Sequence, residues 1–449
     1  MRPTQAKLFW LGGEDHLAMS TGFQDQTVLL LGNYRPTLSI ARQLTLQGAR
    51  VITVREGCDR GAEVSRYVDD IWDSPPIDGS PATFIRALEA FVAKDKSISV
   101  VMPVAEEFVR VIAQNPPQLR DTVTLATMDG SLVSACLSKP HMMALAEETG
   151  VPIAPYATVM DAADLKEKAR DIGFPIVVRP MVSTKRIGGD KTVTIADSSG
   201  LAERFLPWND EWGGLIVQRQ ATGRRHNIYF AAKDGEIRRL LHAVIVRTDR
   251  LDGSGLAVEG QTVEADDALV RYTARLLERL NYNGIGCAQF LVDDETGSIC
   301  FLEINPRIAG NHAVPEHCGL DLAGFLIALA QGRESGLALL PYGHGGVRYS
   351  WVAGDVDGLK SALKGRKIGV RAAFRWAWDI PRTAFSSDLD MMLRWDDPLP
   401  GLANLMDVIP IVGHLTRLRH RRTGGAGQSI GSGRAVPGNT PPSSELSKL

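Results

Sequence analysis

The first part of the chain alternates short apolar runs with helical patterns. Residues 27–31 are an apolar run ended by a glycine, which predicts a buried strand followed by a turn. A proline then opens a stretch with apolar residues at helical spacing, and residues 51–54 are the next apolar run. This order predicts parallel strands joined by a crossover helix. A second such unit begins at residues 98–104, so we expect residues 24–127 to form a small doubly wound α/β domain.

The pattern changes in residues 128–335. Two helices are expected first, at residues 139–149 and 161–171. Short apolar runs between Gly- and Asp-rich turns then predict antiparallel strands, at residues 176–179, 192–195, 215–218, 227–232 and 237–247. The last expected elements are a helix at 266–280, strands at 284–292 and 299–304, and an apolar helix at 320–331. We therefore expect residues 128–335 to be an α+β region.

The C-terminal part has a different composition. Between residues 360 and 422 there are twelve Lys and Arg against six Asp, interspersed with Trp376, Trp378 and Trp395. We expect residues 336–422 to be a helical extension that packs its tryptophans against the body; a helix for a membrane surface or a partner is the alternative. Residues 423–449 are expected to be disordered, because Gly, Pro, Ser and Thr dominate them. Residues 1–23 are taken as an N-terminal extension.

Composition narrows the class of protein. With 449 residues, 44% of them apolar, the chain can bury a large core, and its net charge of −2 excludes a generally basic nucleic-acid binder. No apolar run is long enough for a transmembrane segment, and we see no signal peptide. The five cysteines form no CxxC pair, which argues against a disulfide framework or a zinc site. We expect a cytoplasmic protein that binds no nucleic acid.

The loop after the first strand reads Gly-Asn-Tyr-Arg-Pro. It lacks the three glycines of a dinucleotide-binding turn, so a nicotinamide site is not supported. Arg35 at the start of the helix could bind an anion, but a solvated surface arginine is the interpretation we prefer.

The sharpest chemical signal is a set of metal-ligand residue types on two neighbouring strands. Gln289 lies in one predicted strand and Glu303 at the end of the next, and a hairpin holds such strands about 5 Å apart. Asn305 shares a strand face with Glu303 because the two are two residues apart. One carboxylate and two amide oxygens suit Mg²⁺, with Mn²⁺ as a substitute, and Arg307 follows with a guanidinium for a phosphate or developing anion. An edge-strand Glu beside a turn-forming Asn-Pro is the alternative.

The segment Phe-Leu-Glu-Ile-Asn-Pro-Arg, with Gln289 upstream in Cys-Ala-Gln-Phe, resembles the metal-binding strands of the ATP-grasp superfamily. The spacing most resembles the synthetase subunits of carbamoyl phosphate synthetase. The resemblance covers roughly residues 100–332. It implies a pre-ATP-grasp α/β domain and a two-lobed ATP-grasp fold, and it does not cover the C-terminal helical extension expected from the pattern above. It also implies that Gln289, Glu303 and Asn305 hold the Mg²⁺ ions that bridge the phosphates of ATP.

The resemblance implies two cations for the phosphates. Lys139 precedes a helix that ends in Thr-Gly-Val-Pro, where relatives place a phosphate-binding Lys or Arg. Arg179 ends the strand Gly-Phe-Pro-Ile-Val-Val-Arg-Pro, which resembles the strand that presents a cation to the α- and β-phosphates. A cation fixed on a strand loses little freedom when it binds a polyanion. Surface lysine and surface salt-bridging arginine are the alternatives.

Residues 182–191 resemble the glycine-rich loop that folds over the triphosphate. Gly188 and Gly189 would let backbone amides approach phosphate, and Lys185 adds charge and is taken as a catalytic candidate with Arg307. A solvated basic hairpin is the alternative interpretation.

The hinge strand departs from the family pattern. Backbone groups of Val217, Gln218 and Arg219 are expected to contact adenine. Relatives carry Glu near Arg219 and again near Arg225, and both are replaced here, which puts the ribose contact in doubt. Asn311, after the metal strands, is interpreted as a helix cap rather than a substrate contact.

The function that the resemblance implies is an ATP-dependent carboxylate–amine ligase. It would activate a small carboxylic acid as an acyl phosphate with Mg-ATP and join it to an amine. The alternatives are an ATP-grasp small-molecule kinase and a nucleotide-binding regulatory protein without turnover. A homodimer is compatible with the sequence but not indicated by it.

Overall fold

The computed structural model describes most of the chain. The described residues are 22–57, 61–77, 80–181, 185–190, 192–340 and 342–409. The tail expected to be disordered and most of the N-terminal extension lie outside them. Within the described ranges, no helix combines the length and the apolarity that a membrane crossing requires.

The N-terminal region is a parallel sheet with the strand order β3-β2-β1-β4-β5. Its strands are β1 (Thr27–Leu31), β2 (Arg50–Val54), β3 (Asp70–Trp72), β4 (Ile98–Pro103) and β5 (Thr124–Leu125). The helices that join them are α1 (Arg35–Leu46), α2 (Pro81–Lys94) and α3 (Glu106–Gln114). All four strand pairs are parallel, as the strand–helix–strand pattern predicts.

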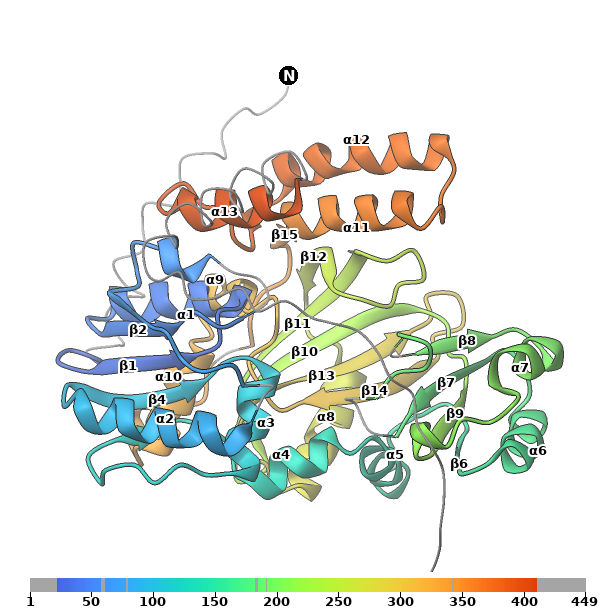
Figure 1. The fold of residues 1–449 in the computed structure, drawn as a ribbon, viewed down its shortest axis with the longest axis horizontal. Coiled ribbons are helices and arrows are strands. Elements are labelled where there is room, and N and C mark those ends of the chain that lie inside the picture. Colours follow the sequence, from blue (N-terminus) through green and yellow to red (C-terminus); the bar gives the residue numbers. More distant parts are fainter. Residues whose placement is uncertain are drawn as a thin grey trace, which may run out of the picture. The chain divides into compact units, whose positions relative to one another are not determined.

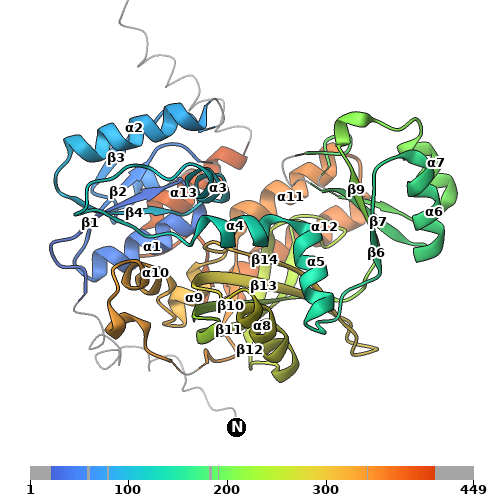
Figure 2. The same ribbon diagram turned by 90° about the horizontal axis from the view of Figure 1, so that it is seen from below.

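Helices cover both faces of this sheet. Leu29 and Leu31 of β1 pack with Phe84 of α2 and Phe108 of α3 in one core cluster. The alternate residue, Leu30, is fully buried on the other face, where Figure 2 shows α1. The doubly wound α/β arrangement expected of this region is confirmed.

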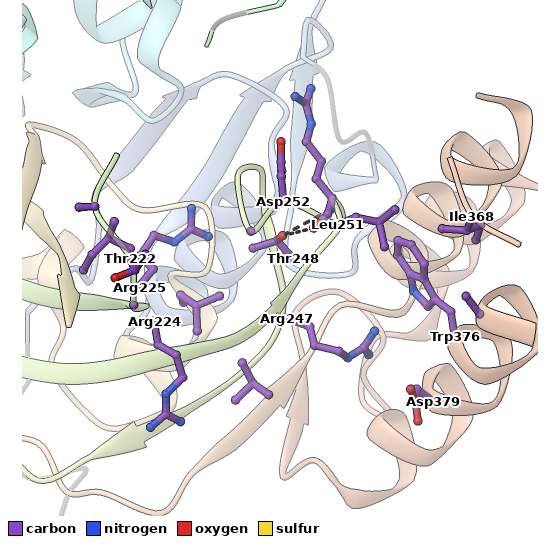
Figure 3. Close-up of a pocket in the computed structure, with 18 of the residues that line it drawn as sticks. Thr222, Arg224, Arg225, Arg247, Thr248, Leu251, Asp252, Ile368, Trp376 and Asp379 are labelled. Atoms are coloured by element: carbon purple, nitrogen blue, oxygen red, sulfur yellow. Dashed lines mark hydrogen bonds between the residues drawn. The ribbon is translucent and has the colours of Figure 1, made fainter. Parts of the chain in front are cut away.

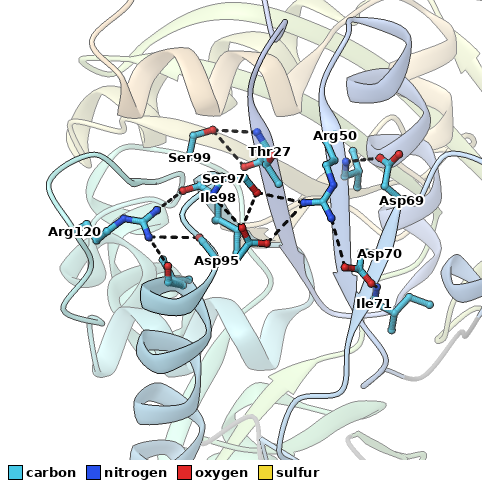
Figure 4. Close-up of polar contacts among 12 residues, drawn as sticks. Thr27, Arg50, Asp69, Asp70, Ile71, Asp95, Ser97, Ile98, Ser99 and Arg120 are labelled. Carbon is cyan, nitrogen blue, oxygen red and sulfur yellow. Dashed lines mark hydrogen bonds and ion pairs between the residues drawn. The ribbon is translucent and has the colours of Figure 1, made fainter.

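Polar contacts close the edge where strands β1, β2 and β4 begin. The guanidinium of Arg50 lies 3.4 Å from Asp70 and 3.7 Å from Asp95, and the backbone amide of Thr27 donates to Ser99 Oγ at 3.2 Å (Figure 4). Arg120 donates to the carbonyl oxygen of Ile98 at 2.7 Å. These pairs are largely exposed and contribute little stability each. The opposite edge, where the parallel strands end, is the edge at which open α/β sheets commonly bind ligands.

A four-stranded antiparallel sheet follows, with the strand order β6-β9-β7-β8. Its strands are β6 (Tyr156–Val159), β7 (Ile176–Pro180), β8 (Val193–Ile195) and β9 (Leu215–Arg219). The helices α6 (Ala162–Ile172) and α7 (Ser198–Phe205) cover one face and share a core with Val178 and Val217. The other face carries Arg179, because side chains alternate along a strand.

The largest sheet has seven strands, in the order β14-β13-β10-β11-β12-β15-β16 (Figure 1). They are β10 (Arg224–Lys233), β11 (Glu236–Thr248), β12 (Ala257–Val263), β13 (Gly284–Val292), β14 (Ile299–Asn305), β15 (Arg348–Ser350) and β16 (Leu389–Asp390). The helices of this region are α4 (Gly130–Leu137), α5 (Lys139–Glu148), α8 (Asp267–Arg279), α9 (Ala313–His317) and α10 (Leu322–Ala330). Short 3-10 helices lie at Ala62–Val64, Asp210–Trp212 and Glu334–Leu337.

The C-terminal extension is part of the large sheet and not only helical. It forms α11 (Val352–Lys364), α12 (Val370–Ser386) and α13 (Pro398–Val408), and its strand β15 pairs with β12 and with β16. Local sequence pattern did not predict β15 and β16, because each has only two or three residues. The domain boundaries at residues 127 and 335 stay predictions.

A buried ion cluster fastens α12 to the sheet. Arg247 of β11 donates to Glu259 at 2.5 Å and to both carboxylate oxygens of Asp355, at 3.1 and 2.6 Å. Trp376 of α12 donates to the same Asp355 at 2.5 Å, and Thr383 donates to Glu259 at 3.2 Å. The packing expected of the tryptophans is correct for Trp376 alone.

Two other tryptophans of the extension point outward. Trp378 is 73% exposed, and Trp395 is fully exposed. The prediction that the extension packs its tryptophans against the body is wrong for both. Trp378 is exposed because only one side of α12 faces the sheet, and Trp395 lies after that helix, between β16 and α13. The four described cysteines are free thiols: Cys136, Cys287 and Cys300 are buried and Cys318 is half-buried.

Candidate active site

The residues predicted to bind metal lie side by side on β13 and β14. Gln289 is directly opposite Glu303 in this antiparallel pair. Asn305 lies two residues further along β14, and its amide nitrogen donates to Glu303 Oε1 at 2.9 Å. The hairpin therefore brings one carboxylate and two amide side chains to one face of the large sheet.

The polar row continues on the next strand. Asn227 of β10 is paired with Gln289, so the three strands present Glu303, Gln289 and Asn227 in register. The amide oxygen of Asn227 is buried without a hydrogen-bond partner, while its nitrogen donates to the Tyr229 hydroxyl at 3.1 Å. A buried acceptor left unpaired is costly unless a ligand or water satisfies it. Sequence reasoning missed Asn227, although an Asn between Ile and His in an apolar strand was a usable signal.

Cations surround the single carboxylate of this row. Lys139, the first residue of α5, places Nζ 3.5 Å from Glu303 Oε2. Arg179 of β7 donates to Gln218 at 3.2 Å, and its Nε is buried without a partner. Burial lowers the pKa of Arg179, and the Glu303 carboxylate opposes that shift. Both cations predicted to meet phosphate therefore lie beside the predicted metal ligands.

Arg307 joins the same cluster from the end of β14. Its Nη2 donates to Asn305 Oδ1 at 3.4 Å, and its Nε donates to Glu106 of α3 at 3.2 Å. The Glu106 contact ties the metal strands to the carboxyl edge of the N-terminal sheet. Burial raises the pKa of Glu303, but the neighbouring cations, Lys139 first, outweigh that effect and hold the pKa below its ordinary value.

The glycine-rich segment forms a tight turn. Ile187 and Asp190 exchange backbone hydrogen bonds of 2.9 and 3.1 Å around Gly188 and Gly189. Both glycines have positive φ, 56° and 92°, a conformation that favours glycine. Residues 182–184 and Lys191 lie outside the described residues.

Lys185 does not join the phosphate cations. Its Nζ donates to the backbone carbonyl oxygen of Glu211 at 2.7 Å. Glu211 lies in the 3-10 helix that precedes β9. Sequence reasoning placed Lys185 with Arg307 because both are basic, but it could not foresee that this backbone oxygen would hold the ammonium. A catalytic role for Lys185 would require its release from Glu211.

The hinge strand β9 presents Gln218 and not Val217 toward Arg179. Val217 is fully buried in the core of the smaller sheet. The amide of Arg219 already donates to Pro155 O at 2.8 Å, so it is not available to adenine. The Arg219 side chain lies on the same strand face as Val217, away from Arg179. Of the three residues, only Gln218 has its side chain on the face of the phosphate cations, and the backbone contacts of Val217 and Gln218 with adenine stay predictions.

Two sequence interpretations near the N-terminal sheet are wrong. Arg35 was expected to be solvated, yet it is 3% exposed and stacks on Trp351 with its guanidinium carbon 3.5 Å from the ring centre. Asn311 does not cap α9; its amide donates to the Tyr349 hydroxyl at 3.1 Å. Tyr349 lies in β15 and Trp351 follows that strand directly. Each is distant in the sequence from the residue it contacts, so local pattern could not reveal these contacts.

A cavity of about 600 Å³ adjoins the polar row (Figure 3). Leu291, two residues after Gln289, and Arg225, two residues before Asn227, belong to its wall, and α12 supplies Arg375 and Trp376. Arg225 donates to Gly255 O at 3.0 Å, but its Nε is buried without a partner. Arginine is the prevailing charged residue of the lining, so the cavity suits an anion.

His226 and His242 lie on the opposite face of the large sheet. Their ring nitrogens Nδ1 and Nε2 are 2.9 Å apart, and burial lowers the pKa of His226 to about 4. Burial also lowers the pKa of His242, so both rings are neutral at pH 7.

Part of the chain is similar to proteins of known family. Residues 260–337, which include every predicted metal ligand, match the family described as "Carbamoyl-phosphate synthase L chain, ATP binding domain". The N-terminal section of the carbamoyl phosphate synthase large chain of Methanopyrus kandleri is 25% identical over 201 residues, which are 43% of this chain and 35% of that protein. The chain spans between 15% and 42% of the lengths of the curated relatives it is compared with.

Solved structures share the fold. An ADP complex of N5-carboxyaminoimidazole ribonucleotide synthetase superposes with a TM-score of 0.57 at 13% identity, over 80% of this chain and 97% of that one. The biotin carboxylase domain dimer of 2-oxoglutarate carboxylase from Hydrogenobacter thermophilus, determined with MgADP and bicarbonate, gives 0.53 at 16% identity over 71% of each chain. The protein thus has the ATP-grasp fold. The family match and the shared fold confirm the resemblance to carbamoyl-phosphate-synthase-like ATP-grasp domains, while the metal-binding role of Gln289, Glu303 and Asn305 stays a prediction.

Proposed function

We propose that this protein is an ATP-dependent ligase that activates a carboxylate as an acyl phosphate and joins it to an amine. The proposal rests on the family match, on the fold, and on the charge arrangement around Glu303. The relatives cover other reactions and longer chains, so the acid, the amine and the assembly are part of the proposal. A homodimer stays a prediction.

The observation that carries the proposal is an unbalanced charge cluster. Glu303 is one carboxylate with Lys139 at 3.5 Å, while Arg179 and Arg307 both act on its pKa. Lys139, Arg179 and Arg307 outnumber the two carboxylates of the cluster, Glu303 and the Glu106 that pairs with Arg307, so the site keeps an excess positive charge that attracts a further anion. A triphosphate supplies that charge, and cations fixed in place lose little freedom when they bind it.

The donor set fits Mg²⁺ that is shared with a nucleotide. Among the described residues, no group of three or more His, Cys, Asp or Glu side chains could hold a metal by itself. Glu303, Asn305 and Gln289 offer three oxygens, and Mg²⁺ commonly takes its remaining ligands from phosphates and water. When bound, the metal would neutralise charge on the β- and γ-phosphates.

The chain's own residues have defined tasks in such a reaction. A carboxylate oxygen of the acid attacks the γ-phosphorus, the bond to the bridging β-phosphate oxygen breaks, and ADP leaves. The amine nitrogen then attacks the acyl carbon, phosphate departs with the electrons of the acyl–oxygen bond, and the amine loses a proton to water or phosphate. Arg307, held by Glu106 and Asn305, supports stabilisation of the negative charge that develops on the acyl oxygens.

The cavity beside the polar row is proposed to bind the acid. Within the residues that the structure describes, Arg250 and Arg375 of its lining have no ion pair, and Arg225 keeps an unpartnered Nε. Trp376, Leu251 and Ile368 add apolar wall. A carboxylic acid with an apolar or planar body satisfies both parts of this lining.

One observation bears on the competing regulatory function. The basic replacement at Arg219 motivated a nucleotide sensor without turnover, because relatives carry an acidic residue nearby. The side chain of Arg219 lies on the face of β9 away from Arg179, close to Gly173. The Arg219 side chain therefore does not face the phosphate cations, and its positive charge does not argue against the ligase proposal.

The test is ADP release from Mg-ATP with pooled carboxylic acids and amines, followed by mass spectrometry of the products. An amide product with stoichiometric ADP supports the ligase. A stable phosphorylated product without amine incorporation would establish the kinase instead. ATP binding without ADP release from any pool would establish the regulatory function.

A further inference from the structure

The outer side of α12 is an apolar stripe. Val370, Phe374 and Trp378 are each 73% exposed, and Phe385 is 92% exposed. The first three follow each other at intervals of four residues and Phe385 comes seven residues later, which puts them along one side of a helix. We call these four residues the outer stripe.

The helix cannot turn to bury this stripe. Its inner side is fixed by the hydrogen bonds from Trp376 to Asp355 and from Thr383 to Glu259. Trp376 and Thr383 are 9% and 6% exposed. The outer stripe is therefore held outward by a buried ion cluster on the opposite side of the same helix.

Exposed apolar side chains gather in this part of the chain. Among the described residues, nine of the eighteen large apolar side chains that are exposed lie between residues 363 and 402. The segment has about a tenth of the described chain, so the concentration is not an average property of the surface. Clustered exposed apolar side chains on a folded protein indicate an interaction site.

The charge next to the stripe is positive. Residues 360–386 contain seven Lys and Arg and one carboxylate, Asp379. Arg371 and Arg375 lie on α12 itself and are exposed, and Arg382 is also exposed and lies 3.8 Å from Asp379. Lys364, Arg366 and Lys367 stand just before the helix.

We infer that α12 binds to the surface of a membrane that contains anionic lipids. A helix with Trp and Phe along one side and arginines at its flanks lies in the headgroup region, with the aromatic side chains in the acyl boundary. Anionic headgroups complement the flanking cations. A second copy of the chain would instead bring two positively charged stripes together, which like charge opposes.

The test is flotation of the full-length protein with vesicles of phosphatidylcholine and phosphatidylglycerol. We expect wild type to float with these vesicles, and much less with pure phosphatidylcholine. The variant Phe374→Ser with Trp378→Ser should lose affinity by about tenfold or more, because it removes two aromatic anchors. The matched control is Leu46→Ser with Met160→Ser, two side chains of 58% and 61% exposure outside the extension, which should float like wild type.

Charge is tested separately. Arg371→Glu should weaken vesicle binding several-fold and reduce its dependence on salt, since each cation near an anionic surface adds to the attraction. Neither the stripe nor Arg371 contributes to the proposed active site, so ADP release in solution should stay at the wild-type level. Membrane binding and catalysis can thus fail independently.

A second measurement detects contact between the tryptophans and the acyl chains directly. Vesicles with brominated acyl chains should quench wild-type tryptophan fluorescence, and the quenching should fall in Trp378→Phe. Absence of wild-type flotation at low ionic strength would overturn the proposal. Concentration-dependent dimerisation that the Phe374→Ser, Trp378→Ser variant abolishes, without vesicle binding, would also overturn it and assign the stripe to a second copy.

Discussion

Two clusters of charge on the large sheet are built from the same residue types and are balanced differently. Around Arg247, one cation meets two carboxylates, Glu259 and Asp355, and each of its three guanidinium nitrogens has a partner within 3.3 Å. Around Glu303, three cations meet two carboxylates, Glu303 and the Glu106 paired with Arg307, and Arg179 keeps a buried Nε without a partner. The first cluster is complete within the chain. The second needs an anion that the chain does not supply.

This difference separates structure from function without reference to relatives. A buried ion pair whose groups are all satisfied fixes geometry, here the seat of α12 on the sheet. A cluster with excess charge and unpaired donors lowers the stability of the ligand-free protein, and a bound ligand restores that stability. The comparison predicts that the two clusters respond in opposite ways to substitution.

The largest effect is expected at the complete cluster. Asp355→Ala leaves Arg247 and the Trp376 donor without their carboxylate, and Asp355 is 3% exposed at its side chain. We expect the free energy of unfolding to fall by about 3–5 kcal/mol. Denaturant unfolding measures this loss. The control is Asp357→Ala on the same helix, whose exposed pair with Lys360 should be worth less than about 1 kcal/mol.

Arg307→Ala should lower kcat by about 10²–10³ with little change in ATP affinity, because its charge acts on the reacting acyl group. The measurement is steady-state ADP release with the acid and amine found in the pool. Arg279→Ala, which breaks an exposed pair with Glu148, is the control and should keep kcat. Equal losses in both variants would remove Arg307 from the chemistry.

A pH effect on stability is expected from His312, which lies outside both clusters. This side chain is fully buried between α1 and α9, donates to or accepts from Ser39 Oγ at 2.9 Å, and has its pKa lowered to about 3 by burial. The unfolded chain binds this proton near pH 6.5 and the folded chain does not, so stability falls as pH drops below that value. At about pH 5 the loss should be about 2 kcal/mol. His312→Gln should flatten the pH dependence of unfolding by that amount; an unchanged slope would contradict the assignment.

The smallest effect on stability is expected at the incomplete cluster. Lys139→Met removes one of three cations around Glu303, so the ligand-free protein should change by less than about 1 kcal/mol in either direction. ATP affinity should nevertheless drop about tenfold, because a phosphate contact is lost. Calorimetric titration with ATP and denaturant unfolding of the same variant test both halves. A large loss of stability with intact ATP binding would make Lys139 structural.

Much of the site could be predicted from sequence because its key residues are close in the chain. The strand pattern around residues 284–305 fixes the hairpin, and the hairpin fixes Gln289 opposite Glu303. The parallel N-terminal sheet was predictable for this reason too. Lys139 at a helix start and Arg179 at a strand end could be assigned from the resemblance to the ATP-grasp superfamily, and not from local pattern alone.

Other parts depend on contacts between distant segments. Asn227 joins the polar row only through the register of β10 with β13, which are about sixty residues apart. Arg35 is buried because Trp351 covers it, and Lys185 is held by the Glu211 carbonyl. The outward side of α12 follows from Asp355, which lies on another helix. Pattern within one segment cannot specify which partner a polar side chain meets.

The most direct test of the central claim is the Mg²⁺ dependence of ATP affinity. Titration calorimetry would compare wild type, Glu303→Gln and the control Glu148→Gln, each with Mg²⁺ and with chelator. We expect Mg²⁺ to tighten ATP binding at least about tenfold in wild type and in the control, and to have no such effect in Glu303→Gln, because the only carboxylate of the polar row is gone. Full Mg²⁺ dependence in Glu303→Gln would show that the metal is held elsewhere and would contradict the account.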